Sequence, residues 1–236
     1  MKAILRSSFL ALAIVALTVP VNAGPWEDGG AAYQRGDYAT ALKIWRPLAE
    51  QGHAAAQHNF GIIYRSGQGV PQDDVEAVKW YRRAAEQGFA EAQFQVGEMY
   101  RKGEGVPKDY AEAAKWFDMA AAKDNGRAQD GFLAMGHNSA AAYNTGDYAT
   151  ALLIWRLLAE RGYLDSQFRL GVMYSGGNGV PQDYIIAYMW FDIAASQGYD
   201  HKVAKARRVI TAGKMTPEQI AETQRLARDW TAKHQQ

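Results

Sequence analysis

The chain contains no cysteine, and that absence excludes several kinds of protein. Without thiols there can be no disulfide bridge, no thiolate zinc ligand and no cysteine nucleophile. An excess of charge of one sign is lacking as well, because 26 Lys and Arg balance 25 Asp and Glu. A nucleic-acid partner is therefore not expected, since phosphate binding needs a basic face. With 48% hydrophobic residues among 236, the composition still predicts a folded chain with a sizeable core.

Long apolar runs are scarce, and the one that stands out lies near the N-terminus. Residues 9–19 follow Lys2 and Arg6 and are too few to span a bilayer, but they are typical of the centre of a secretory signal peptide. Val21 and Ala23 predict cleavage after Ala23. We expect residues 1–23 to be removed, the mature chain to be periplasmic or extracellular, and no integral membrane segment to remain. The alternative is an anchor that stays attached.

The sequence repeats itself at two spacings. A shift of 36 positions superposes the Gly-x-Gly-Val-Pro stretches at 67–71 and 103–107, together with the residues around them. A shift of 110 positions aligns 31–89 with 141–199 without a gap, and 32 of these 59 positions are identical. A short repeat is therefore nested in a longer duplication, which is typical of proteins built from stacked units.

Each full copy of the short repeat predicts two antiparallel helices. Phe60 and Tyr64 lie one turn apart on a first helix, which the glycine-rich stretch 67–71 cannot continue. Asp73 then caps a second helix whose apolar stripe includes Trp80. One such hairpin cannot bury its apolar face alone, so neighbouring hairpins must stack.

This pattern resembles the Sel1-like repeat, a relative of the tetratricopeptide repeat. The residues that carry the resemblance are Ala-Gln, Gly-x-x-Tyr, Gly-x-Gly-Val and Ala-x-x-Trp, in that order. Full copies span 54–89, 90–125 and 164–199, and shortened copies span 27–53 and 137–163. The stretch 126–136 keeps only Ala128 and Gln129 of the pattern, and we interpret it as a degenerate helix joining two halves. The resemblance implies an all-α fold: a right-handed α-solenoid of stacked antiparallel helix hairpins over 24–199.

After residue 199 the repeat stops, and 200–236 predict a C-terminal cap of two helices. Thr216 and Gln219 form a capping-box pattern around Pro217 at the start of the second one. Its inner stripe is expected to contain Ile220, Thr223, Ala227 and Trp230. The first of the two helices carries a basic cluster: Lys202, Lys205, Arg207, Arg208 and Lys214. A solvated helix face explains this cluster, and an acidic partner or an anionic lipid surface is the alternative.

The sequence holds no recognisable catalytic or metal-binding motif. Asp73, Asp109 and Asp183 recur at one repeat position, so we interpret them as helix caps rather than catalytic carboxylates. The recurring tryptophans are interpreted as core residues, with sugar-stacking platforms as the alternative. His53 and His58 are five positions apart, which does not suit a shared metal. We predict that the protein is not an enzyme and that it binds neither a cofactor nor a metal.

Candidate binding residues are those that vary between copies on the first helix of each hairpin. In tetratricopeptide-like stacks these helices line the concave face, so the resemblance implies a groove there for another protein or peptide. The candidates are His58, Ile62, Arg65, Phe94, Glu98, Arg101, Phe168, Val172 and Ser175. For Phe94 and Phe168 the alternative is packing against the next repeat.

The predicted function is that of a periplasmic or secreted scaffold or adaptor, monomeric, which binds a partner on its concave face. The resemblance implies relatives that act in envelope signalling, exopolysaccharide export and host contact. One alternative is a β-lactamase-like or cell-wall-binding activity, described for secreted relatives whose repeats carry paired cysteines. Another is a structural array that self-associates through the first hairpin, where Gly29 and Gly30 replace the usual Leu-Gly.

Overall fold

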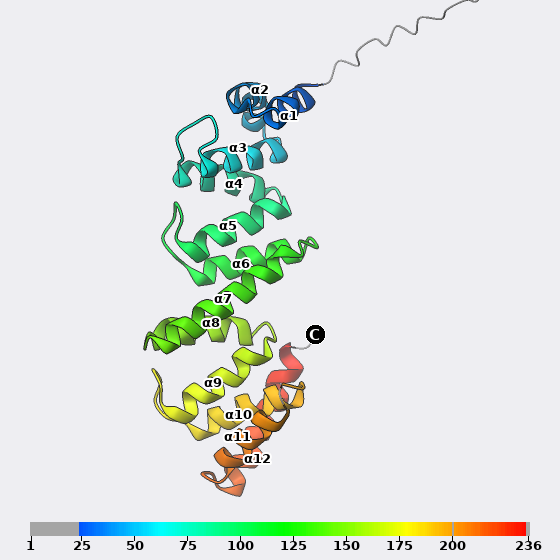
Figure 1. The fold of residues 1–236 in the computed structure, drawn as a ribbon. Helices are drawn as coiled ribbons and strands as arrows, with labels where there is room; N and C mark the ends of the chain where they lie inside the picture. The colour runs from blue at the N-terminus through cyan, green and yellow to red at the C-terminus, as the bar shows by residue number, and fades with distance from the viewer. Residues whose placement is uncertain (1–23, 200, 235–236) are drawn as a thin grey trace, which may run out of the picture.

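The computed structural model describes residues 24–199 and 201–234, and these form twelve helices joined by short turns (Figure 1). The expected signal peptide lies outside the described residues. Ten helices form five hairpins: α1 (Pro25–Gln34) with α2 (Tyr38–Glu50), α3 (Ala54–Ser66) with α4 (Asp74–Glu86), α5 (Ala90–Lys102) with α6 (Tyr110–Ala121), α7 (Arg127–Asn144) with α8 (Tyr148–Ala159), and α9 (Leu164–Gly176) with α10 (Tyr184–Ser196). Two more helices follow, α11 (His201–Ala212) and α12 (Pro217–His234). The all-α fold of stacked helix hairpins is confirmed.

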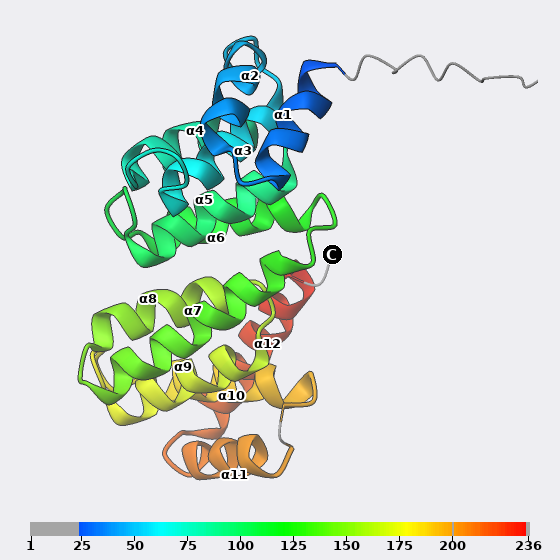
Figure 2. The same ribbon diagram turned by 45° about the horizontal axis from the view of Figure 1, so that its top comes forward.

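The hairpins stack in chain order into an elongated molecule (Figure 1). Within a hairpin the two helices pack side by side, and the second helix also packs on the first helix of the next hairpin. The two halves of the duplication join where α7 contacts both α5 and α6. Figure 2 shows α1 and α11 at opposite ends of the stack.

A glycine at one repeated position sets how closely the helices of a hairpin approach. A Cβ atom built on Gly97 would lie 2.5 Å from the ring of Phe117, and one on Gly171 would lie 2.6 Å from the ring of Phe191. The missing side chain lets the aromatic ring of the second helix lie against the backbone of the first. Gly29 meets the indole of Trp45 in the same way, so packing within the first hairpin accounts for that glycine.

The helix ends follow the sequence pattern. Asp73 Oδ1 accepts a hydrogen bond from the backbone N–H of Glu76 at 2.9 Å, and Asp183 and Asp109 cap α10 and α6 in the same way. Capping therefore explains these carboxylates, as the sequence indicated. Trp45, Trp80, Trp155 and Trp190 are all buried, which confirms that they are core residues. Trp116 is only partly buried and packs against the edge of a core cluster.

The stretch 126–136 does not form a separate element. Nearly all of it belongs to α7, which continues without a break into the shortened copy 137–163. The chain enters this helix through Asp124, which has a left-handed backbone with φ of 57°. The other two full copies have glycine here, Gly88 and Gly198, and glycine adopts a left-handed backbone without strain.

The C-terminal helices cover the last hairpin. Thr216 N–H donates to Gln219 Oε1 at 2.9 Å and Gln219 N–H donates to Thr216 Oγ1 at 3.3 Å, which is the expected capping box. Thr223 and Ala227 face inward, and the ring of Trp230 lies 5.3 Å from that of Trp190. Within the described ranges, no helix combines the length and apolar character needed to cross a bilayer.

Candidate functional site

The aromatic position of the candidate groove is occupied by His58 on α3, Phe94 on α5 and Phe168 on α9. These rings pack against the second-helix aromatic of their own hairpin, with centroid distances of 5.5 Å, 5.8 Å and 5.4 Å to Tyr81, Phe117 and Phe191. Phe94 is only 5% exposed, and Arg127 from α7 covers its ring. Packing between repeats, the alternative considered for Phe94, is what the structure shows.

His58 is buried as well, between Tyr81 and Phe89. Its Nε2 atom has no hydrogen-bond partner among the described residues. Burial lowers the pKa of the imidazole, because the charged form loses its hydration. His58 is therefore a neutral side chain packed in the core.

The polar candidates on α3 and α5 are brought together in one network. Arg65 donates from Nη1 to Gln95 Oε1 at 2.8 Å and from Nη2 to Glu104 Oε2 at 2.6 Å, which ties α3 to the next hairpin. Arg101 Nε pairs with Glu98 Oε1 at 2.7 Å. Ile62 lies beside these residues and packs on the core between α4 and α5.

The Glu98–Arg101 pair is held in its charged form. Burial by itself disfavours the Glu98 carboxylate, but hydrogen bonds and the positive charges of Arg101 and Lys102 outweigh that effect and lower its pKa. The hydrogen bond from Arg101 to Glu98 likewise raises the pKa of the guanidinium. These charges satisfy one another within α5, and it is Arg65 that links α3 to the next repeat.

The candidates on α9 do not join this network, because α7 and α8 lie between α6 and α9. Phe168 stacks on Tyr199 at 5.0 Å between ring centroids, and Val172 packs on the last core cluster. Ser175 Oγ donates to the carbonyl oxygen of Val172 at 3.0 Å. The nine positions thus form two separate groups, and binding by any of them stays a prediction.

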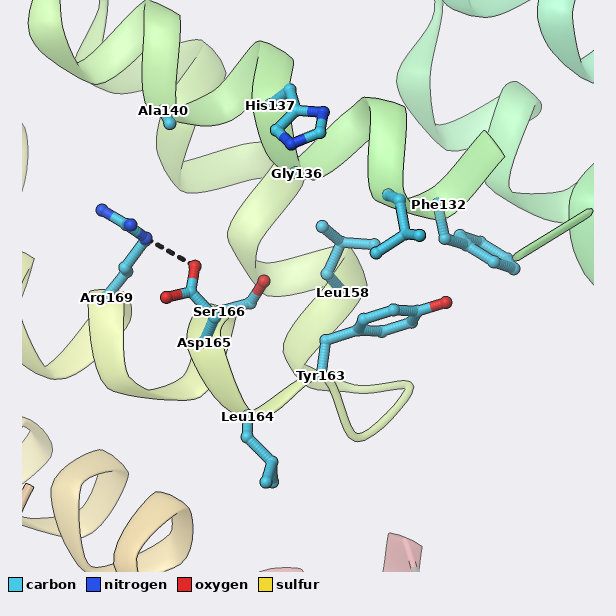
Figure 3. Close-up of a pocket in the computed structure, with 11 residues that line it drawn as sticks. Phe132, Gly136, His137, Ala140, Leu158, Tyr163, Leu164, Asp165, Ser166 and Arg169 are labelled. Carbon is cyan, nitrogen blue, oxygen red and sulfur yellow. Dashed lines mark hydrogen bonds and ion pairs between the residues drawn. The ribbon is translucent and has the colours of Figure 1, made fainter. Parts of the chain in front are cut away.

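A pocket that the sequence did not indicate lies between α7 and α9 (Figure 3). It has a volume of about 360 Å³, and its lining is mainly apolar. In Figure 3, Leu158 of α8 and Tyr163 lie on one side and Gly136 of α7 on the other. Leu133 also lines the pocket and is 51% exposed. The remaining lining residues are Phe132, His137, Ala140, Leu164, Asp165, Ser166 and Arg169. We call this the α7–α9 groove.

At Gly136, α7 contributes no side chain to the groove. Continued back along the two helices, the shift of 110 positions that relates the halves places Trp26 of α1 opposite Gly136. In the first hairpin the Trp26 indole stacks on Trp45 at 5.3 Å and on His53 at 4.8 Å between ring centroids. The same shift relates His53 to Tyr163 of the groove. In the first half the Trp26 indole occupies this position, and a pocket lined by Trp26, Glu27, Gly30 and Asn59 remains beside it.

The edge of the groove is polar and charged. Arg169 Nε pairs with Asp165 Oδ2 at 2.5 Å on one side, as Figure 3 shows, and His137 lies on the other. Burial raises the pKa of the Tyr163 phenol, so this side chain is neutral at physiological pH. No group of metal-ligating side chains gathers anywhere in the described part of the chain. An apolar floor with a charged edge suits an inserted side chain of a partner.

A family model for the Sel1 repeat matches three segments of the chain, 54–89, 90–125 and 164–199. These are the hairpins α3–α4, α5–α6 and α9–α10. The chain thus contains three Sel1 repeats. Sel1 repeats generally act as scaffolds for protein–protein interaction and are typically not enzymes. The hairpin α7–α8, which supplies one wall of the groove, lies outside the matched segments.

Solved structures similar to this chain come from several bacteria. A protective antigen of uropathogenic Escherichia coli, described as having this repeat fold, is 27% identical over 89% of this chain and 53% of its own, with a TM-score of 0.42. The chain thus spans about half the length of that antigen. A Sel1 repeat protein from Oxalobacter formigenes is 29% identical over 88% of this chain and 83% of its own, with a TM-score of 0.44. No curated protein matches the chain.

Proposed function

We propose that this chain is a non-enzymatic scaffold that binds a partner protein by taking one of its apolar side chains into the α7–α9 groove. One observation carries the proposal: Gly136 stands where the first half has Trp26, and it lines an apolar pocket of about 360 Å³. The duplicated hairpin shows that a ring fits against this set of helices. A partner's aromatic side chain is the occupant of matching size, and such side chains commonly dominate interface affinity.

The setting of the groove supports the same proposal. Leu133 stands half exposed at its edge, where it can extend the apolar contact beyond one inserted ring. Arg169, paired with Asp165, supplies polar groups at the rim, which is typical of an interface whose centre is dry. The stacked hairpins hold both walls in place, so little conformational entropy would be lost on binding.

We place this activity in the periplasm or outside the cell, following the signal peptide read from residues 1–23. The N-terminal sequence of the protein recovered from the native host would test this directly. A mature chain beginning at Gly24 is expected. A chain that still carries its first 23 residues and sediments with membranes would overturn the placement.

The groove is tested by photo-crosslinking in the native cell. A photoreactive residue at Leu133, on the edge of the groove, is expected to give a discrete adduct with a partner. The same residue at Ala141, exposed on α7 outside the groove, is the control and should give none. A probe at Phe94 would be uninformative, because that ring is buried.

A second variant separates binding from folding. Gly136→Trp restores the indole of the first half and fills the groove from within, so the Leu133 adduct should fall by tenfold or more. Ala141→Trp adds the same side chain to an exposed site on the same helix and should leave the adduct unchanged. Equal adducts from the Leu133 and Ala141 probes, or an adduct that persists in Gly136→Trp, would refute the groove as the binding site.

A further inference from the structure

The helix α11 presents an apolar surface at the end of the stack. It packs on α10, and Figure 2 shows it at the end of the stack with no helix beyond it. Val203, Val209 and Ile210 are 44%, 61% and 63% exposed, the last two being the most exposed large hydrophobic residues of the described chain. The last helix of a solenoid usually presents only polar side chains on its outer face. The helix α11 differs, because exposed aliphatic side chains lie among its polar ones.

The same surface is strongly basic. Lys202, Lys205, Arg207 and Lys214 are all exposed, and none of them forms an ion pair within the described ranges. The sequence holds no acidic residue from 201 to 217. Arg208 is the exception among the cations, because it turns inward and pairs with Asp192 of α10 at 2.6 Å.

Apolar and basic side chains are arranged in order around the helix. Successive residues of an α-helix are about 100° apart, so Val203, Ala206 and Ile210 fall on one outward stripe. Arg207 lies on one flank of this stripe, and Lys202 lies with Val209 on the other. Ala204 and Thr211, on the opposite side, are buried against the rest of the protein.

We propose that the outer face of α11 docks on an anionic lipid surface. Aliphatic side chains between flanking cations allow shallow insertion at the level of the headgroups, while the cations meet lipid phosphates. Charge complementarity selects this occupant over a second copy of the chain, because two such faces would repel each other. The proposal does not depend on the α7–α9 groove, which uses other helices.

The test is sedimentation with lipid vesicles. The chain is produced from Gly24, the start of the described structure, because the apolar run 9–19 would itself bind lipid. It should cosediment with vesicles of phosphatidylglycerol mixed with phosphatidylcholine, but not with vesicles of phosphatidylcholine alone. Each cation near an anionic surface changes the partition coefficient about fivefold. The triple variant Lys202→Gln, Lys205→Gln, Arg207→Gln should therefore bind at least tenfold more weakly.

A matched control removes the same charge elsewhere. Lys43, Lys108 and Lys123 are exposed and unpaired in the described structure, and their triple change to Gln should alter binding less than twofold. Ile210→Ser should weaken binding with no change of charge. Equal loss in the two triple variants, binding that ignores phosphatidylglycerol, or an Ile210→Ser protein that binds as well as the parent would each overturn the proposal. Equally tight binding to soluble polyglutamate would also overturn it, in favour of an acidic protein partner.

Discussion

The contact between Gly97 and Phe117 gives a direct test of how closely the repeats are packed. In Gly97→Ala the new Cβ atom would lie 2.5 Å from one ring carbon and 3.2 Å from the carbonyl oxygen of Ala113. The ring cannot easily move away, because Phe117 is fully buried with Phe94 and Phe132 on either side. The strain therefore has to be taken up by the separation of α5 and α6.

Two effects of opposite sign decide the result. Alanine stabilises a helix interior relative to glycine by about 0.5–1 kcal/mol. Overpacking of a rigid core costs about 1–3 kcal/mol, and a contact this short belongs at the upper end. We expect Gly97→Ala to lower the free energy of unfolding by about 2 kcal/mol.

Gly136 supplies the matched control, because it also lies inside a helix but has room beside it. Its nearest neighbour would be Leu158 Cδ1 at 3.8 Å, an ordinary van der Waals contact. Gly136→Ala should therefore raise the free energy of unfolding by about 1 kcal/mol, the gain in helix propensity alone.

Urea unfolding followed by circular dichroism measures both changes as shifts of the midpoint at constant slope. When Phe117 is first changed to Leu, the ring that the new Cβ atom would meet is gone. Gly97→Ala should then lower the free energy of unfolding by at least about 1 kcal/mol less than it does in the parent protein. Equal effects of the alanine substitutions at Gly97 and Gly136, or no coupling to Phe117, would refute the close-packing argument.

Two further predictions concern buried and half-buried ionisable groups. His58→Phe should stabilise the fold by about 1 kcal/mol, because it removes a buried unpaired nitrogen and places there the ring that Phe94 and Phe168 supply in other repeats. Burial lowers the pKa of His58 in the folded protein, so the free energy of unfolding of the parent should fall as the pH drops below 6.5. The urea midpoint of His58→Phe should not show this dependence on pH. Glu98→Gln should cost about 1 kcal/mol at pH 7. The pKa of Glu98 is lowered from 4.5 in the folded protein, so the stability that its charge contributes is complete above pH 4.5 and is lost below it. The free energies of unfolding of the parent and of Glu98→Gln should therefore converge in acid. A difference between them that stays constant with pH would contradict this.

Much of the fold could be predicted because its signals are local and repeated. Asp73 and its equivalents fix where second helices begin, and the glycine-rich turns fix where first helices end. Gly97 and Phe117 recur in step in each full copy, so the sequence already pairs the two helices. The signals were weakest at 126–136, where the loss of the motif hid the fact that α7 is one continuous helix.

The binding residues were harder to predict, because exposure depends on how the next hairpin is placed. Phe94 occupies a first-helix position that varies between copies, which suggested a groove, yet Arg127 from α7 closes over it. The sequence does show Trp26 changing to Gly136 between the halves. It does not show that Leu158 and Tyr163 line a pocket beside that glycine. Outward-facing Ile210 was likewise hidden, because helix periodicity does not say which side is covered.

The open groove also has an energetic cost that its proposed function would explain. Glycine inside α7 costs about 1 kcal/mol relative to alanine, and nothing around Gly136 requires a missing Cβ. This sets it apart from Gly97 and Gly171, where the neighbouring ring leaves no choice. Gly136→Ala should thus make the protein more stable and its α7–α9 groove shallower. If the crosslink from Leu133 weakens in this variant while stability rises, the glycine serves the groove rather than the fold.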